Sequence, residues 1–206
     1  MNCNIAVVVT GATGSNLAIK FLQLLQEQEI SSDVVFSHQG MANLALEYGY
    51  SVAEIPQMDT QELSQVVRQH VPSQCRIHDA SHFFSPLASG SGAPMALVVL
   101  PASMGYCARV AQGSSETLAE RVFDVCLKEQ RPILVCPRES PLSQVHLRNL
   151  LELSTMGVQI VPFMPEFYSH QRGSMDKQID RFVSRLAGML QVNAHYSRWM
   201  DGSEAP

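Results

Sequence analysis

The fold of this chain is decided by residues 5–10, IAVVVT, and by the small-residue turn Gly11-Ala12-Thr13-Gly14 that follows them directly. A run that is apolar without alternation is typical of a strand covered on both faces. Similar short runs recur at residues 34–37, 96–100, 133–136 and 159–161. With helices between them, such strands predict a parallel sheet wrapped by helices, in an α/β domain wound right-handed.

Helical periodicity fills the stretches between these runs. Apolar residues share one helical face in three segments: Leu17, Phe21, Leu22 and Leu25; Leu118, Val122, Val125 and Cys126; and Leu147, Leu150, Leu151 and Leu153. Residues 175–190 predict a closing helix with Ser174 as its N-cap, followed by a tail to residue 206. Residues 71–95 break the alternation. Their Pro, Ser, Gly and His content predicts a long binding loop or lid, with a plain surface excursion as the alternative.

Length and charge narrow the class of protein. The chain has 206 residues, with 14 Lys and Arg against 19 Asp and Glu, and this length predicts one domain over residues 1–206. Its acidic balance argues against broad electrostatic binding to nucleic acid or anionic membranes, and no apolar run reaches the ~18 residues of a membrane span. Charged residues make up 16% of the chain, below the usual ~25%, which indicates a subunit that buries surface against copies of itself.

The cysteines give no sign of a metal or a disulfide framework. There are five, an odd number, and none forms a CxxC motif: Cys3, Cys75, Cys107, Cys126 and Cys136. We therefore expect reduced thiols and no metal site. No basic segment or cleavage site of a secretory signal is visible at the N-terminus. Both observations predict a cytoplasmic protein.

Polar residues or small-residue turns follow every predicted strand. The first strand leads into Gly11-Ala12-Thr13-Gly14, where backbone N–H groups can approach an anion at a helix N-terminus. The later strands lead to Ser37-His38, Pro101-Ala-Ser103-Met-Gly-Tyr106, Arg138-Glu139 and the segment 162–168. Ligands of doubly wound sheets bind beyond the carboxyl ends of the strands. These turns together predict one binding crevice.

Two cations lie on the helix before the fourth of these strands. Arg121 and Lys128 are seven residues apart, so they project from nearly the same side of that helix. Asp124 could pair with either of them, which would make them an ordinary solvated ladder. Arg185, on the closing helix, could likewise be a simple surface residue.

The motifs resemble the flavin prenyltransferase family of the UbiX type. They match in order and at family spacing over nearly the whole chain: Thr10-Gly-Ala-Thr-Gly14, Ser37, Glu47, Ala88-Ser-Gly-Ser91, Pro101-Ala-Ser103, Glu120-Arg121, Leu127-Lys128-Glu129-Gln-Arg131-Pro132, Pro137-Arg138-Glu139-Ser-Pro-Leu142, His146-Leu147, Phe167-Tyr168, Arg185 and Arg198-Trp199. The block from Leu127 to Leu147 is the most specific of them.

The resemblance implies a fold and an activity. It implies a three-layer Rossmann-like or flavodoxin-like subunit in a closed homo-oligomer, commonly a dodecamer. The implied reaction transfers a dimethylallyl group from dimethylallyl monophosphate to N5 and C6 of reduced FMN, without metal. The product, prenylated FMN, serves UbiD-type decarboxylases, often in ubiquinone synthesis or aromatic-acid breakdown.

The resemblance also assigns roles to residues of this chain. It implies an FMN site formed by Gly11, Ala12, Thr13, Ser37, Ser103, Met104, Gly105, Tyr106 and Arg138. The implied prenyl phosphate site comprises Tyr168, Arg185, Arg121, Lys128, Ser89 and Gly90. The implied catalytic residues are Glu47 and Glu139, with Lys128 and Arg121. On this view Arg121, Lys128, Arg138 and Arg185 share a single pocket.

Several positions depart from the family pattern, among them a usual Pro that is missing from Ser169-His-Gln-Arg172. Thr13 replaces a usual Ser, His38 a common Lys, and Phe123 a small residue. Tyr106 replaces a small Thr, which predicts an altered flavin contact or a partly filled prenyl pocket.

Two other functions stay open on the sequence. One is a flavin-dependent cysteine decarboxylase of the related fold, which the turn Pro101-Ala-Ser103 favours. Arg138-Glu139, in place of that group's PAMN-type segment, and the lack of a matching catalytic His oppose it. The other is a non-catalytic FMN-binding subunit, whose best support is Tyr106.

Overall fold

A single parallel sheet forms the centre of the computed structural model, which describes residues 4–165 and 174–192. Its six strands are β1 (Asn4–Val9), β2 (Ser31–Phe36), β3 (Arg76–Asp79), β4 (Ala96–Ala102), β5 (Ile133–Pro137) and β6 (Gln159–Ile160). They lie in the order β3-β2-β1-β4-β5-β6. The chain thus runs outward in opposite directions from β1 and β4, which makes the junction of these two strands the point where a crevice opens.

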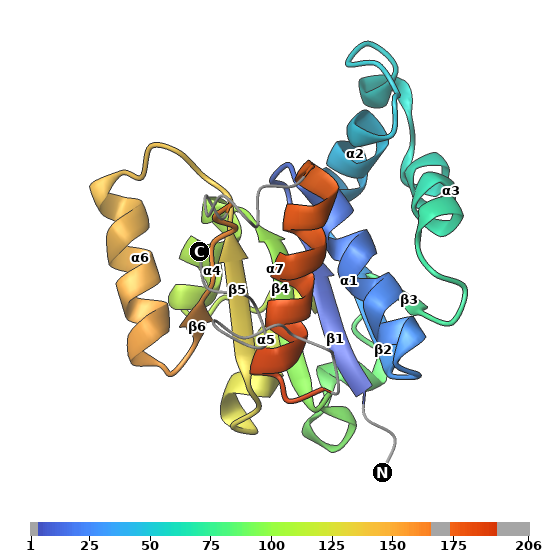
Figure 1. Cartoon of the computed structure of the whole chain (residues 1–206). Coiled ribbons are helices and arrows are strands. Elements are labelled where there is room, and N and C mark those ends of the chain that lie inside the picture. The colour runs from blue at the N-terminus through green and yellow to red at the C-terminus, as the bar shows by residue number, and fades with distance from the viewer. Residues whose placement is uncertain (1–3, 166–173, 193–206) are drawn as a thin grey trace, which may run out of the picture.

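Helices cover both faces of the sheet, as Figure 1 shows, with α1 and α7 in front and α4 and α5 behind. One face packs against α1 (Ser15–Glu27), α2 (His38–Glu47), α3 (Thr60–His70) and α7 (Met175–Met189). The other packs against α4 (Met104–Ala111), α5 (Leu118–Lys128) and α6 (Gln144–Thr155). Short 3₁₀ turns form η1 (Ile55–Gln57), η2 (Pro86–Ala88) and η3 (Gly90–Gly92). The predicted doubly wound α/β architecture is confirmed.

Alternate strand residues feed two separate hydrophobic clusters. On β1, Val7 and Val9 belong to the cluster under α1 and α7, while Ala6 and Val8 belong to the one under α4 and α5. All four are fully buried. The continuous apolar run is explained by this burial on both faces.

The structure differs from the sequence prediction at two places. Part of the expected loop 71–95 is the edge strand β3, whose residues Arg76 and Asp79 are exposed and give no apolar run. On α6, Leu153 is buried, whereas Leu147 and Leu151 are more than half exposed. The predicted apolar face of α6 is therefore only partly covered within one chain. The closing helix α7 is confirmed, with Ser174 at its N-cap.

Asp33 anchors the edge strand β3 to β2. Its carboxylate accepts two hydrogen bonds from the guanidinium of Arg76, both at 2.8 Å, one from His78 Nε2 at 2.6 Å and one from Asn4 Nδ2 at 2.5 Å. Asp33 itself is buried. Burial raises the pKa of this carboxyl, but the hydrogen bonds from His78, Arg76 and Asn4 outweigh it and hold the pKa well below its ordinary value.

Tyr106 fills the core between α4 and α5. Its side chain is 1% exposed, its hydroxyl donates to the carbonyl of Ala119 at 2.8 Å, and its ring meets that of Phe123 edge-on with centroids 6.4 Å apart. Two of the departures from the family pattern are therefore neighbours in one hydrophobic cluster.

We expect the Asp33→Asn variant to lose about 3 kcal/mol of unfolding free energy at neutral pH, because a buried charge network loses its centre. A carboxyl whose pKa is lowered by folding stabilises the fold above the pKa of the unfolded chain, about 3.9, and this contribution is lost as the pH falls further. Denaturant titrations between about pH 7 and pH 2 should therefore show a steeper acid loss for the wild type than for Asp33→Asn. The exposed Asp180→Asn, which removes a weak ion pair with Lys20, is the control. Parallel curves for wild type and Asp33→Asn would contradict the assignment.

The Tyr106→Phe variant should be less stable by about 1 kcal/mol, since it removes one buried hydrogen bond and leaves the ring packing in place. Tyr48→Phe, whose exposed hydroxyl lies 3.4 Å from Asn16 Oδ1, should stay within about 0.5 kcal/mol of wild type. Thermal or urea unfolding measures both. Equal stabilities of the two variants would show that the Tyr106 hydroxyl is not anchored as described.

Candidate active site

A cavity opens beyond the carboxyl ends of β1, β4 and β5, and is called here the edge cavity. It has a volume of about 670 Å³, within the ~300–1,000 Å³ of small-molecule sites. Its polar side chains are those of Thr13, Asn16, Arg138, Glu139 and Ser140. Its apolar walls include Leu17, Leu100, Cys136, Leu142, Phe163, Met164, Met175 and Ile179. The sequence prediction of a crevice formed by the turns after these strands matches this position.

Hydrogen bonds between the turns fix the floor of the edge cavity. The Thr10 hydroxyl donates to the carbonyl of Pro101 at 2.9 Å and accepts from the backbone N–H of Ser103 at 2.7 Å. The N–H of Arg138 donates to the carbonyl of Ala102 at 3.1 Å. The turns after β1, β4 and β5 are therefore held in fixed register with one another.

Ser37 and Ser103 begin the helices that leave this edge. The Ser37 hydroxyl accepts from the N–H of Gly40 at 3.1 Å at the start of α2, and the Ser103 hydroxyl accepts from the N–H of Tyr106 at 3.3 Å at the start of α4. Both serines are N-caps. The first turns of α2 and α4 thus meet the carboxyl edge of the sheet, where a helix N-terminus favours an anion.

Glu47 occupies the N-terminus of α1. Its carboxylate accepts from the N–H groups of Gly14, Ser15 and Asn16 at 2.6, 3.0 and 3.0 Å. The anion that contacts this turn is therefore the carboxylate of Glu47 in the same chain. Glu47 does not line the edge cavity, although the turn that it holds does.

Arg121 and Lys128 lie away from the edge cavity in a single chain. The guanidinium of Arg121 donates to the carbonyl of Ala88 at 3.0 Å and pairs with Asp124 at 2.6 Å. Lys128 pairs with Glu129 at 2.5 Å, and a Cβ on Gly90 would collide with both of these side chains. Lys128 ends the helix that leads into the start of β5, and η3 leads into the start of β4. Lys128 and Gly90 are therefore near the amino edge of the sheet, and β4 alone spans roughly 20 Å.

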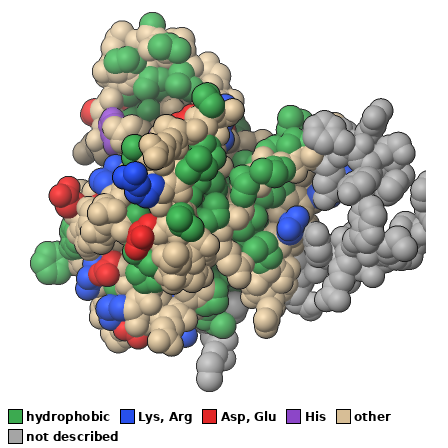
Figure 2. Space-filling view, turned by 90° about the vertical axis from the view of Figure 1, so that its left-hand side faces the viewer, with side chains coloured by type: hydrophobic (Ala, Val, Ile, Leu, Met, Phe, Trp, Pro, Cys, Tyr) green, Lys and Arg blue, Asp and Glu red, His purple; other side chains and the backbone are tan. Residues whose placement is uncertain are grey.

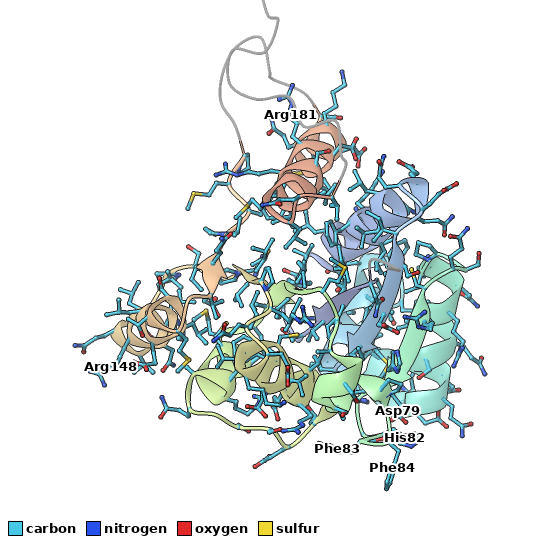
Figure 3. The ribbon with its side chains drawn as sticks, turned by 90° about the horizontal axis from the view of Figure 1, so that it is seen from below. Asp79, His82, Phe83, Phe84, Arg148 and Arg181 are labelled. Carbon is cyan, nitrogen blue, oxygen red and sulfur yellow. The ribbon has the colours of Figure 1, made fainter. Side chains whose placement is uncertain are left out.

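Arg185 lies next to the edge cavity. It lines a smaller cavity of about 180 Å³, which shares Ile160, Pro162 and Met164 with the edge cavity as a common wall. Figure 3 shows α7, which carries Arg185 and the labelled Arg181, on the opposite side of the sheet from Phe83 and Phe84 of the loop before η2. One chain thus places Arg138 and Arg185 at one site and Arg121, Lys128, Ser89 and Gly90 at another. Tyr168 lies outside the described residues.

The ring of Tyr106 does not enter the edge cavity. It belongs to the core between α4 and α5, so the prediction that it fills part of a prenyl pocket is wrong. The residue is close to the site only through its backbone at the start of α4. Sequence reasoning also missed apolar wall residues of the cavity such as Cys136, Phe163 and Met175, since nothing in an ordinary apolar residue marks it as a wall.

The described residues contain neither a cluster of metal ligands nor a membrane-spanning helix. No group of three or more His, Cys, Asp and Glu side chains in residues 4–165 and 174–192 could hold a metal ion. Within the same ranges, every helix is too short or too polar to cross a bilayer.

Comparison with known proteins agrees with this geometry. The family model described as Flavoprotein matches residues 1–190. The flavin prenyltransferase UbiX of Pseudomonas aeruginosa is 35% identical over 188 residues, which cover 91% of this chain and 89% of that protein. UbiX of Aquifex aeolicus is 35% identical over 95% of this chain and 97% of its own.

Solved structures give the same result. A UbiX protein in complex with FMN and dimethylallyl pyrophosphate superposes with a TM-score of 0.83 at 31% identity, over 99% of this chain and all of that one. A dodecameric FMN-dependent UbiX-like decarboxylase of Escherichia coli O157:H7 gives 0.81 at 32% identity, over 97% and 100%. The cysteine decarboxylase TvaF is 13% identical over 78% of this chain and 90% of its own, with a TM-score of 0.54, and shares the fold alone. The chain therefore belongs to the flavoprotein family and, within it, to the UbiX-type flavin prenyltransferases.

Proposed function

We propose that this chain transfers a dimethylallyl group from dimethylallyl monophosphate to N5 and C6 of reduced FMN, producing prenylated FMN. The observation that carries the proposal is the edge cavity, in which Arg138 and Glu139 meet an apolar wall at the junction of β1, β4 and β5. The P. aeruginosa relative, 35% identical over 91% of the chain, supports it. The cysteine decarboxylase alternative rests on likeness of fold only.

The residues at the carboxyl edge fit FMN. Gly11 lies so close to α2 that a Cβ on it would come within 2.6 Å of Gln39 Cβ, so only glycine lets the turn pack this closely against α2. Since Glu47 already satisfies the amides of α1, the phosphate of FMN would meet the first turns of α2 and α4, beside Ser37 and Ser103. Arg138 would hold the flavin at the mouth of the edge cavity. Tyr106 would contribute its backbone only.

Each remaining group has a task that its chemistry suits. A phosphomonoester carries about −1.5 to −2 charges at pH 7, and cations that stabilise its developing charge make it a better leaving group. Apolar walls such as Leu142 and Met164 exclude water from an allylic cation. Reduced FMN supplies the nucleophilic atoms when bound. Glu139, whose Oε1 accepts from the N–H of Ser140 at 3.1 Å, would be the carboxylate that accepts a proton in the cavity.

We propose further that the phosphate site is completed by a second copy of the chain. Arg121, Lys128, Ser89 and Gly90 do not line the edge cavity of their own chain, and Lys128 and Gly90 sit near the opposite edge of the sheet. Large apolar side chains are exposed near both places: Met164 (72%) and Met175 (61%) at the edge cavity, and Phe84 (95%) before η2. A head-to-tail contact between two such different surfaces forms a ring when its rotation closes. The dodecameric E. coli relative supports such an assembly.

The face of the molecule that carries α6 supports the same assembly. Figure 2 shows apolar side chains spread over this face, and Leu142, Val145, Leu147 and Leu151 are 41 to 66% exposed. Exposed apolar residues grouped in this way mark an interaction surface. The subunit would therefore bury this face against another copy.

A UbiD-type decarboxylase would receive the product, and the cytoplasm would be the place of synthesis. We infer this recipient from the resemblance to the UbiX-type family. Cys107, Cys126 and Cys136 are buried free thiols, which is typical of a reducing compartment.

Purified protein incubated with dithionite-reduced FMN and dimethylallyl monophosphate should yield a flavin heavier by one prenyl unit in mass spectrometry. Dimethylallyl pyrophosphate, run in parallel, separates the two donors, since the cation cluster would meet a larger and more charged leaving group. An unchanged flavin mass together with CO₂ release from a cysteinyl substrate would favour the decarboxylase. Tight FMN binding without either reaction would favour a binding subunit.

Glu139→Gln and Lys128→Ala should each retain FMN affinity within about twofold and lose at least ~100-fold in transfer rate, because each removes a charge that acts in the transition state. If the site is shared, refolding the two variants together should restore up to about a quarter of the wild-type activity, since some mixed sites combine an intact Lys128 with an intact Glu139. Oligomers made of one variant alone are the control. A mixed oligomer as inactive as its parents would place both residues in one chain.

A further inference from the structure

Hydrogen bonds link three side chains, Asp33, His78 and Ser85, in a series that runs from β2 to the segment that carries Ser89 and Gly90. Asp33 Oδ1 lies 2.6 Å from His78 Nε2, and His78 Nδ1 lies 3.0 Å from Ser85 Oγ. Asp33 is buried, and His78 and Ser85 are half-buried. The contact joins a central part of the sheet to a segment whose preceding residues, Ser81 to Phe84, are exposed.

The donors and acceptors of this hydrogen-bonded series are complementary. A carboxylate has no proton, so His78 Nε2 donates to Asp33. In the neutral imidazole Nδ1 then accepts from the Ser85 hydroxyl, whose oxygen in turn accepts from the N–H of Leu87 at 3.3 Å. Each polar atom that links these three side chains has a hydrogen-bond partner, and a change of the His78 ring or the Ser85 hydroxyl breaks the series.

At the other end of this series, Ser85 influences the position of the Ser89-Gly90 turn through η2. Ser85 is the N-cap of η2, and Leu87 at its centre is 1% exposed. The N–H of Ser89 donates to the carbonyl of Pro86 at 3.1 Å, so the position of η2 sets that of Ser89. Gly90 follows and packs against Lys128 and Glu129, while the carbonyl of Ala88 holds the guanidinium of Arg121.

We propose that His78 and Ser85, anchored by Asp33, are positioning residues that set the geometry of the Ser89-Gly90 turn, Arg121 and Lys128 toward the prenyl phosphate. This inference rests on the proposed function, because it assumes that these groups bind the donor. Figure 3 shows the labelled neighbours Asp79, His82, Phe83 and Phe84 gathered at one margin of the molecule, with Phe84 pointing outward. The segment therefore needs an inward anchor, and Ser85 supplies it.

Serine, histidine and aspartate also make the triad of many hydrolases, but the surroundings here favour positioning. The Ser85 oxygen is engaged as the cap of η2, so attack on a substrate would break the turn. The Asp33 carboxylate is shared with Arg76 and Asn4, so it is not dedicated to orienting His78.

The test compares Ser85→Ala with Ser85→Thr, which keeps the hydroxyl, and with Ser81→Ala. Ser81 is exposed, and its hydroxyl donates to Asp79 of its own segment. In Ser85→Ala we expect the KM for dimethylallyl monophosphate to rise about three- to tenfold, with the FMN dissociation constant and kcat at saturating donor within about twofold. Ser85→Thr and Ser81→Ala should behave as wild type. His78→Phe should raise the KM at least as much as Ser85→Ala.

The outcomes separate the inference from the proposed function. If the wild type fails to prenylate FMN, the proposed function is wrong. If the wild type turns over and Ser85→Ala keeps a normal KM, the positioning role is wrong and the function stands. Equal losses of kcat and FMN affinity in Ser85→Ala, without rescue by Ser85→Thr, would also overturn it, since that pattern belongs to general loss of structure.

Discussion

The hydroxyl of Thr10 holds the junction on which the site depends. It bonds at once to the carbonyl of Pro101 and to the N–H of Ser103, and so ties the end of β1 to the end of β4. Beyond this tie the chain diverges, because α1 covers one face of the sheet and α4 the other. A crevice at this point follows from the topology. The turns that line it inherit their positions from one buried side chain.

The charged side chains differ in how many hydrogen bonds hold them and in how exposed these contacts are. Glu47 accepts three backbone hydrogen bonds and is held as part of the α1 N-terminus. The pairs Arg121–Asp124 and Lys128–Glu129 are each about one-third to one-half exposed. Exposed pairs of this kind contribute about 0–1 kcal/mol, so neither pair costs much free energy to break. The ion pairs with Asp124 and Glu129 thus orient the side chains of Arg121 and Lys128 while leaving them partly exposed.

The sequence predicted the α/β fold because burial on both faces leaves a direct mark, a continuous apolar run such as that of residues 5–10. It predicted the turns of the edge cavity because ligand sites lie at the carboxyl ends of parallel strands. It missed β3, since Arg76 and His78 are placed by their bonds to Asp33 and not by an apolar pattern. It also expected four cations in one pocket of one chain. Periodicity shows which residues share a helix face, and it carries no information on which edge of a sheet that part of the helix reaches.

The departures from the family pattern leave the chemistry-bearing positions largely intact. Tyr106 and Phe123 face each other in the core behind α4, where a larger ring is accommodated by its neighbour and by the Ala119 carbonyl. Thr13 keeps the hydroxyl of the usual serine at the edge cavity. His38 lines a separate cleft of about 360 Å³ between α2 and α3. Because none of these changes removes Arg138, Glu139, Arg121 or Lys128, the reading of this chain as a bare flavin-binding subunit loses its main support, the supposed obstruction by Tyr106.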